Sequence, residues 1–288
     1  MAQPAISVKD LTFSYGDILA VDDISFDVAE GEVIGFLGPN GAGKSTVVKM
    51  LTGQLTPQNG SATLLGMDIV KDRKQVQQEI GISFEFTNLY EQMNAVENLN
   101  LFAKLYRVPD FDAIDLLQKV GLGGRDKEHV ANYSKGMKQR LMMARALVSD
   151  PKMLFLDEPT DGLDPVSTET IHTLIRAATQ TGTTVFLTTH DMVEADKLSD
   201  RVAFLNQGKI VALDTPARLK QRFGMRALKV EVELPNGDIE VREVTLDEDQ
   251  TPQTVFDLFK SERILTVHSE EATLEDIFFD ITGRGLQG

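Results

Sequence analysis

A glycine-rich stretch from Gly38 to Thr46 carries the residues best suited to holding a phosphate group. Its order, Gly-Pro-Asn-Gly-Ala-Gly-Lys-Ser-Thr, matches the spacing G-x-x-x-x-G-K-[ST]. Glycines let consecutive backbone N–H groups turn toward one anion, Lys44 can reach the β- and γ-phosphates of a nucleotide, and the Ser45 hydroxyl can bind Mg²⁺. The nucleotide contacts predicted in this stretch are Gly38, Pro39, Asn40, Gly41, Ala42, Gly43, Lys44, Ser45 and Thr46.

The residues on either side place this loop between a strand and a helix. Val33 to Leu37 is an apolar run typical of a buried strand, and Ser45 to Leu51 has the pattern of the first turns of a helix. The N-terminus of that helix would add unpaired N–H groups and the positive end of its dipole. Because strand, loop and helix occur in the order that a phosphate site requires, we predict a nucleotide site and not an accidental glycine-rich turn.

Two adjacent carboxylates follow a second buried strand. Met153 to Leu156 is a short apolar run, and Asp157 and Glu158 come directly after it. Carboxylates there are costly unless charged partners meet them, and ligands of open α/β sheets bind at that end of the strands. Asp157 suits a Mg²⁺ ligand, direct or through water, and Glu158 suits a group that orients or deprotonates an attacking water. An ordinary acidic turn is the alternative, and the phosphate-binding loop argues against it.

A third strand ends at a histidine. Thr183 to Thr189 is rich in β-branched residues, and His190 follows it. Strands and helices alternate along the chain, which favours a parallel sheet. Such a sheet would bring Lys44, Glu158 and His190 to one edge. The other three histidines are predicted to lie in loops or on helix surfaces: His129, His172 and His268.

An aromatic residue ends the first predicted strand. Ile6 to Tyr15 and Ile18 to Val28 alternate apolar and polar residues around a Gly16-Asp17 turn, as a half-buried hairpin does. The Tyr15 ring could stack on a nucleotide base. Residue type alone favours a simple surface aromatic.

Further polar residues stand at the ends of predicted elements. Ser134 is placed to cap a helix that runs to Val148, and the N-terminus of that helix could face an anion. Asp164 is placed to cap a helix from Val166 to Gln180. Glu85 follows a strand predicted over Ile80 to Phe84.

The chain is predicted to form two domains. Helical patterns from about residue 86 to 148 form an insert in the strand–helix alternation. Met225 to Gly288 holds 15 acidic and 6 basic residues and a hairpin signal at Pro235-Asn236-Gly237-Asp238. We therefore predict domains over residues 1–223 and 224–288. The fold class is α/β: a P-loop NTPase core with N-terminal antiparallel β strands and an all-helical insert, plus a small C-terminal α+β module of structural or partner-binding use.

Composition limits the function classes. The 29 basic and 44 acidic residues give a net charge of −15, which argues against a general role on nucleic acid. No apolar run is long enough for a transmembrane helix and no secretory signal is evident, so the chain is expected to stay where it is made. The absence of cysteine excludes disulfides, thiolate zinc sites and thiol catalysis.

Taken in order, five separated elements resemble the ATP-binding subunits of ABC transporters, most of all those of ABC-2 type exporters. The resemblance is strong from Ile6 to Phe223 and looser for the stretch Ala272 to Phe278. It implies that Gly38 to Thr46 is the Walker A loop. It also implies that Asp157 is the Walker B carboxylate and Glu158 the catalytic base.

The remaining roles come from the same resemblance. Tyr15 matches the aromatic that stacks on adenine, and His190 matches the switch histidine that contacts the γ-phosphate and the attacking water. Ser134 and Gly136 belong to the signature sequence that grips ATP bound to the opposite subunit, and Asp164 to the loop that couples two subunits. The catalytic set so implied is Glu158, His190 and Lys44, and the metal set is Ser45, Asp157 and Glu85.

Two positions depart from the family pattern. The usual signature Leu-Ser-Gly-Gly-Gln is here Tyr-Ser-Lys-Gly-Met, which keeps the Ser134 hydroxyl and Gly136 but loses the Gln. Glu85 stands where the family usually has Gln. An ionised carboxylate only accepts hydrogen bonds, so Glu85 can bind Mg²⁺ but its γ-phosphate sensing is in question, and an ordinary strand-end acid is the alternative.

The expected function is ATP hydrolysis that powers an ABC-2 type exporter, with ATP and Mg²⁺ bound. Two identical subunits are expected to close on ATP and to move a separately encoded transmembrane permease at the cytoplasmic face of the membrane. One alternative is a non-transport ABC ATPase acting on nucleic acid or ribosomes, which the net charge of −15 disfavours. A third hypothesis is a nucleotide-binding module whose acidic tail binds a protein partner.

Overall fold

The computed structural model describes residues 3–224, 226–234, 236–246, 251–261 and 263–283. The chain forms two compact units, Met1–Leu213 and Asp214–Gly288. This division falls ten residues before the predicted boundary, because helix α8 (Pro216–Phe223) packs against α10 (Leu274–Thr282) of the second unit. Pro235 of the predicted hairpin turn lies outside the described residues.

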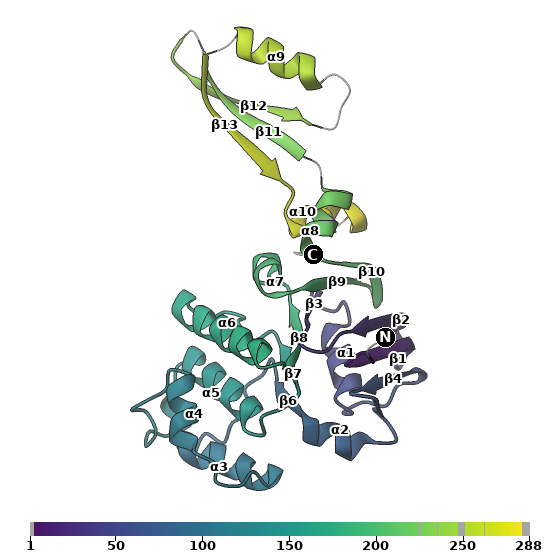
Figure 1. Cartoon of the computed structure of the whole chain (residues 1–288), viewed down its shortest axis with the longest axis vertical. Helices are drawn as coiled ribbons and strands as arrows, with labels where there is room; N and C mark the ends of the chain where they lie inside the picture. The colour runs from purple at the N-terminus through teal and green to yellow at the C-terminus, as the bar shows by residue number, and fades with distance from the viewer. Residues whose placement is uncertain (1–2, 225, 235, 247–250, 262, 284–288) are drawn as a thin grey trace. The chain divides into compact units, whose positions relative to one another are not determined.

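A six-stranded sheet forms the centre of the first unit (Figure 1). Parallel pairing joins β9 to β3, β3 to β8, β8 to β7 and β7 to β6, as the strand–helix alternation predicts. The strands in spatial order are β10 (Lys209–Asp214), β9 (Arg201–Asn206), β3 (Val33–Leu37), β8 (Thr184–Thr189), β7 (Met153–Asp157) and β6 (Ile80–Ser83).

The central strands β3, β8 and β7 are buried along their whole length because both faces of the sheet are covered. Successive side chains of a strand point to opposite faces. On β7, Phe155 packs into one hydrophobic core, and Leu154 and Leu156 pack into the other. The first core includes a run of aromatic rings, with centroids 4.6 Å apart between Phe36 and Phe186. The near-continuous hydrophobic runs in the sequence therefore reflect burial on two sides.

A second, antiparallel sheet covers the first core (Figure 1). Its order is β2 (Ile18–Val28), β1 (Ile6–Tyr15), β4 (Asn59–Leu64) and β5 (Met67–Asp68), with antiparallel pairing throughout. Helix α1 (Lys44–Leu51) packs between the two sheets and buries Val47, Val48, Met50 and Leu51 in that core. The predicted N-terminal antiparallel strands are confirmed.

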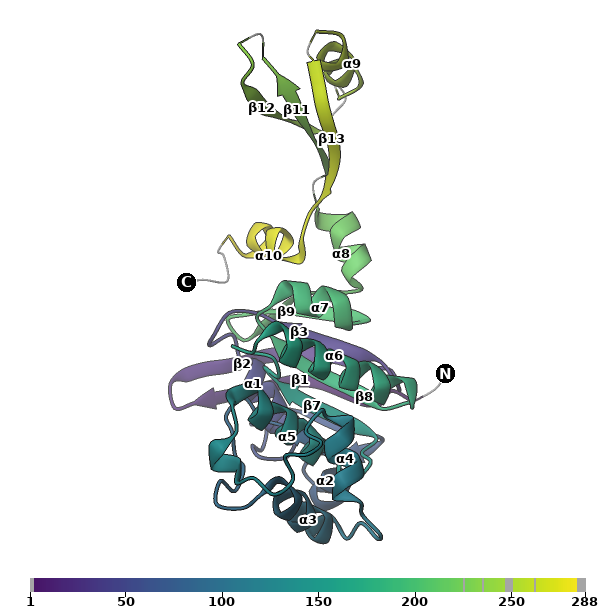
Figure 2. The ribbon, with the colours of Figure 1, turned by 90° about the vertical axis from the view of Figure 1, so that its left-hand side faces the viewer.

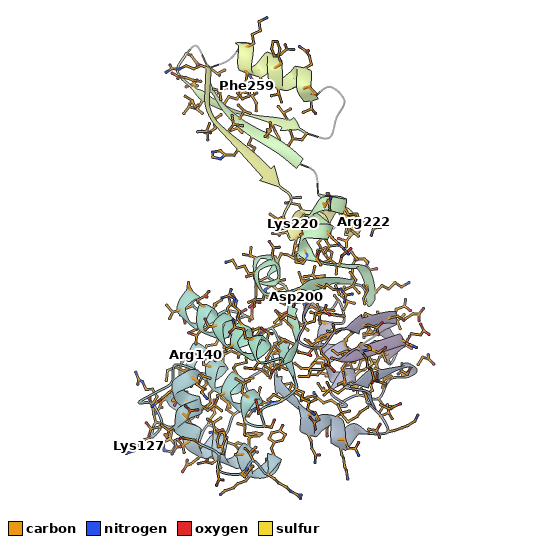
Figure 3. The ribbon with its side chains drawn as sticks, viewed as in Figure 1. Lys127, Arg140, Asp200, Lys220, Arg222 and Phe259 are labelled. Atoms are coloured by element: carbon orange, nitrogen blue, oxygen red, sulfur yellow. The ribbon has the colours of Figure 1, made fainter. Side chains whose placement is uncertain are left out.

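The opposite face of the six-stranded sheet carries the predicted helical insert (Figures 1 and 2). Its helices are α3 (Ala95–Tyr106), α4 (Ala113–Lys119), the short 3₁₀ turn η1 (Val130–Asn132) and α5 (Lys135–Leu147). The capping box predicted from Asn94 and Glu97 is present at the start of α3. Arg140 on α5, labelled in Figure 3, donates from Nη1 to the Gly121 carbonyl at 2.8 Å. This bond joins α5 to the residues after α4.

Three more helices of the first unit connect strands: α2 (Arg73–Glu79), α6 (Pro165–Gln180) and α7 (Met192–Leu198). Asp164 caps α6, and Pro165 occupies its first position, as the sequence predicts. Asp200, between α7 and β9, accepts a hydrogen bond from the Val33 backbone N–H at 2.8 Å and so holds the start of β3 (Figure 3).

The second unit has a three-stranded sheet in the order β12 (Ile239–Thr245), β11 (Arg226–Glu233) and β13 (Arg263–Glu271), with antiparallel pairing. Helix α9 (Thr251–Ser261) lies along this sheet (Figure 1). Val230 and Val232 of β11 are buried, whereas Phe259 of α9, labelled in Figure 3, is 55% exposed. The predicted α+β module is observed.

Candidate active site

The phosphate-binding loop follows β3 and leads into α1. Gly43 has φ +108°, and a Cβ on it would lie 2.3 Å from the Ala20 carbonyl oxygen. A Cβ on Gly38 would lie 2.2 Å from the carbonyl oxygen of Leu205. Only glycine fits these two positions, since the obstacles are backbone atoms. The loop is thus clamped between β2 and β9.

The other loop residues complete this turn. The Ala42 N–H donates to the Pro39 carbonyl at 3.1 Å, and the Ala42 carbonyl accepts from the Gly208 N–H at 3.0 Å. Asn40 and Gly41 are exposed, and Thr46 is buried. The loop therefore presents its tip to solvent and anchors its base in the core.

Lys44 is almost completely buried at the first position of α1. Its Nζ donates to the Gly38 carbonyl at 2.6 Å and lies 3.1 Å from Glu158 Oε1. Both side chains of this ion pair are shielded from water, so the charges attract each other strongly. A phosphate entering the loop would compete with Glu158 for the same ammonium group.

Asp157 ends β7 beside the phosphate-binding loop. Its Oδ1 accepts hydrogen bonds from Ser45 Oγ at 3.1 Å and from Thr188 Oγ1 of β8. Burial raises the pKa of Asp157, and the two hydroxyl donors oppose that rise. A buried carboxylate with a neighbouring hydroxyl supplies the oxygen ligands that Mg²⁺ prefers. The structure thus brings together two of the three predicted metal ligands.

Glu158 and His190 form a direct pair at the same sheet edge. Glu158 Oε2 lies 2.9 Å from His190 Nδ1 and accepts from the His190 backbone N–H at 3.2 Å. The Glu158 backbone has φ +49°, unusual for a residue with a side chain, and its N–H donates to the Thr188 carbonyl at 3.0 Å. The sequence predicted that Lys44, Glu158 and His190 would meet, and the structure brings them together.

Glu85 lies just past β6 and is exposed. Although the residue as a whole is exposed, desolvation of its carboxyl group is the largest cause that raises its pKa. The charges of Asp157, Glu158 and Asp161 raise the pKa further, whereas Lys44 lowers it. Glu85 therefore senses the charges of the site. Across the described residues, no three acidic or histidine side chains are already arranged around a metal position. The role predicted for Glu85 in metal binding stays a prediction.

Ser134 and Asp164 cap neighbouring helices. Ser134 Oγ accepts from the Met137 N–H at 3.3 Å at the start of α5. Asp164 accepts hydrogen bonds from the Ser167 N–H at 2.9 Å and from Ser167 Oγ at 2.7 Å. Both bonds lower the pKa of Asp164, and the bond from Oγ has the larger effect. A Cβ on Gly136 would lie 2.3 Å from Ser167 Oγ. The two helix starts therefore lie side by side, and a glycine is what allows it.

Tyr15 lies at the tip of the β1–β2 hairpin, whose β2 strand touches the phosphate-binding loop at Ala20. Its ring is 45% exposed and packs edge-on against Phe13 at a centroid distance of 4.9 Å. A partly exposed aromatic ring of this kind is suited to stacking on a base.

The sequence prediction for one histidine is wrong. His172 was expected on a helix surface or in a loop, but it is 5% exposed in α6 and lies 3.1 Å from the buried Glu194 of α7. His172 stands three residues before Ile175, at the edge of the apolar stripe of α6, and this spacing is the one sequence signal for its burial. His129 and His268 are exposed, in a loop and on β13.

Comparisons with known proteins identify the family. The ABC transporter family profile matches residues 21–161. A fluoroquinolones export ATP-binding protein of Mycobacterium tuberculosis is 43% identical over 98% of this chain and 94% of its own length. A Nod factor export ATP-binding protein I of Rhizobium meliloti is 36% identical over 98% of this chain and 89% of its own. The chain belongs to the ATP-binding subunits of ABC transporters. The ATPase function and the exporter assignment are thereby confirmed, and these relatives favour an exporter over the nucleic-acid alternative.

Solved structures of ABC subunits have the same fold. An ATP-binding subunit of an ABC transporter superposes with a TM-score of 0.70 at 29% identity, over 76% of this chain and 93% of the other. An ATP-binding cassette solved as a dimer with ADP and phosphate gives a TM-score of 0.67 at 25% identity, over 73% of this chain and 98% of its own. Among the helices that the structure describes, none is long and apolar enough to cross a membrane. An export subunit of this kind implies a membrane partner.

Proposed function

We propose that this ABC subunit hydrolyses ATP with Glu158 as the base and His190 as the group that holds the attacking water. The observation that carries the proposal is the Lys44–Glu158–His190 cluster, with distances of 3.1 and 2.9 Å, at the mouth of a phosphate-binding loop. The loop N–H groups and Lys44 bind the phosphates and stabilise the charge that develops on them. Tyr15 stacks on the adenine.

Ser45 and Asp157 would hold Mg²⁺, with Glu85 as the third candidate ligand. Their oxygen donors fit this ion, and Asp157 is already held toward Ser45 at 3.1 Å. Held by these residues, the ion would supply positive charge that offsets the charge of the phosphates.

Glu158 is restrained before ATP arrives. Its two carboxylate oxygens are shared between Lys44 and His190. A γ-phosphate would draw Lys44 away, since it offers a greater negative charge, and this exchange releases one oxygen of Glu158 toward water. Hydrolysis in this proposal therefore begins only when the loop is filled.

A second copy of the chain completes the site. Ser134 and Gly136 at the start of α5 would contact ATP bound to that copy, and Asp164 would lie at the junction between the two. Support comes from the exposed N-terminus of α5, which is a suitable anion site, and from the related cassette that was solved as a dimer. All of the site residues are present in one sequence, which favours a homodimer.

The membrane partner is a separate permease that holds this subunit at the cytoplasmic face of the membrane. We place its contact in a groove of about 630 Å³ between the six-stranded sheet and the helical insert. Exposed Leu105, Tyr90 and Tyr106 line it, and the buried Arg145 stacks over Phe102 at 4.9 Å. The two relatives described above are named for different cargoes, so we infer that the permease selects the cargo.

The acidic second unit serves structure or partner binding.

The test is Glu158→Gln in the purified chain. The amide keeps the size of the side chain but cannot act as a base, so ATP should still bind while turnover nearly stops. Glu79→Gln, which removes a surface partner of Lys152, is the matched control and should leave turnover unchanged. Retained turnover in Glu158→Gln would contradict the assigned base. Purification from detergent extract should recover a multi-span permease with the chain, and recovery of RNA alone would contradict the transporter assignment.

A further inference from the structure

Thr160, His172 and Glu194 form a buried polar cluster that is not part of the site described above. Glu194 Oε1 accepts a hydrogen bond from Thr160 Oγ1 at 2.6 Å and lies 3.1 Å from His172 Nε2. Glu194 and His172 are 3% and 5% exposed, and Thr160 is half-buried. One carboxylate oxygen thus joins two groups that come from different parts of the chain.

Each member of this cluster belongs to an element that leads to the active site. Thr160 comes two residues after Glu158, in the loop that follows β7. Glu194 lies in the first turn of α7, four residues after His190, and its own N–H is held by the Asp191 cap at 3.0 Å. His172 belongs to α6, which is capped by Asp164. The cluster therefore ties together the loop that carries Glu158, helix α7 that follows His190, and helix α6 that follows Asp164.

Stability alone does not explain the cluster. Within the described parts of the chain, Glu194 Oε2 and His172 Nδ1 are buried without a hydrogen-bond partner. His172 Nδ1 is 3.7 Å from Glu169 Oε2, too far for a hydrogen bond, and the Glu169 side chain is 66% exposed. Buried polar groups that are only half satisfied cost free energy compared with an apolar core of the same shape. A functional use for the fixed geometry accounts for that cost.

We propose that Glu194 is a positioning residue for ATP hydrolysis, which fastens the Glu158 loop to the helix that follows His190 through the Thr160 hydroxyl. His172 holds Glu194 in this orientation from the side of α6. The proposal deepens the proposed function and rests on its assignment of Glu158 and His190 as the catalytic pair.

The geometry of the catalytic pair explains why such a fastening matters. At the active site the loop meets the residues before α7 through the Glu158–His190 pair, whose side chains must separate far enough to admit water and yet remain aligned. Asp161 of the same loop lies farther from His190, at 4.0 Å from its Nε2. The 2.6 Å bond from Thr160 to Glu194 fixes the same two segments a few residues away. Losing it lets the pair drift, and a misplacement of about 1 Å can lower a rate by about 100-fold.

The central experiment compares Thr160→Val with Thr160→Ser. Valine keeps the shape but removes the hydroxyl, whereas serine keeps the hydroxyl. We expect kcat to fall at least about fivefold and at most about 100-fold in Thr160→Val. The KM and the dissociation constant for ATP should stay within about twofold, because Lys44 and the phosphate-binding loop are untouched. Thr160→Ser should keep kcat within about twofold of wild type.

A second experiment measures kcat for His172→Leu and for the double variant Thr160→Val/His172→Leu. Both groups act on one carboxylate oxygen, so the loss in the double variant should be smaller than the product of the single losses. Glu169→Gln, on the other side of His172, is the matched control and should retain kcat.

Three outcomes would overturn the inference: wild-type kcat in Thr160→Val, equal losses in Thr160→Val and Thr160→Ser, or an ATP affinity that falls as much as kcat. A different result, turnover that survives Glu158→Gln, would instead contradict the proposed function. The two failures are therefore distinguishable.

Discussion

The contact between the starts of α5 and α6 allows a quantitative prediction for Gly136→Ala. An added Cβ would lie 2.3 Å from Ser167 Oγ and 3.0 Å from Ser167 Cβ. Ser167 is not free to turn away, because its Oγ donates to Asp164 Oδ2 at 2.7 Å. The substitution must therefore either separate the two helices or break this hydrogen bond.

Two opposing effects set the size of the change. Alanine is favoured over glycine inside a helix by about 1 kcal/mol. Overpacking of a buried position costs about 1–3 kcal/mol, and Gly136 is buried. We expect a net loss of about 1 kcal/mol in the free energy of unfolding, in the direction opposite to helix propensity.

Urea unfolding, followed by circular dichroism, measures this change in four proteins: wild type, Gly136→Ala, Ser167→Ala and the double variant. If the two units unfold in separate transitions, the transition of the nucleotide-binding unit is the one that moves to higher urea when ATP is added, since a ligand stabilises the state that binds it. Because Ser167→Ala removes the obstructing oxygen, Gly136→Ala should cost at least about 1 kcal/mol less in that background.

The reasoning fails if Gly136→Ala is as stable as wild type or if the two substitutions are additive. Either result would mean that the helices have room for a methyl group.

The remaining predictions concern the nucleotide site. Tyr15→Ala should raise the dissociation constant for ATP about tenfold through loss of stacking, while Tyr15→Phe should preserve it. Titration with a fluorescent nucleotide measures both constants, and equal losses of affinity in the two variants would exclude stacking. The pKa of Glu85 is raised in the folded protein, so its ionisation lowers stability progressively as the pH rises through the ordinary glutamate range and the raised folded value. Glu85→Gln should remove this loss, so the free energy of unfolding of the variant should fall less than that of wild type as the pH rises above the ordinary glutamate range. Urea unfolding at a series of pH values measures this difference, and identical pH profiles would contradict the assigned environment.

The catalytic edge was predictable because its signals are local. The glycine spacing around Lys44, the apolar run before Asp157 and the β-branched run before His190 specify a loop and two buried strands within a few residues. Parallel pairing of β3, β8 and β7 then follows from the alternation of strands and helices and brings the three side chains together.

The parts that sequence alone did not provide depend on contacts between distant residues. The burial of His172 is set by α7, and its sequence neighbours do not reveal that contact. The domain boundary was placed by a change in charge, whereas the packing of α8 against α10 moves it to Leu213. The raised pKa of Glu85 arises first from desolvation and then from carboxylates some 70 residues away in the chain, and no local pattern records either cause.

The alternation of side chains on β7 has an evolutionary consequence. Phe155 belongs to the core under the nucleotide site, and Leu154 and Leu156 belong to the core under the helical insert. Substitutions at alternate positions of this one strand therefore perturb two separate cores. Under the proposed docking of the permease on the helical insert, a lineage of such subunits can change the core beneath that surface while the core beneath the nucleotide site is inherited unchanged.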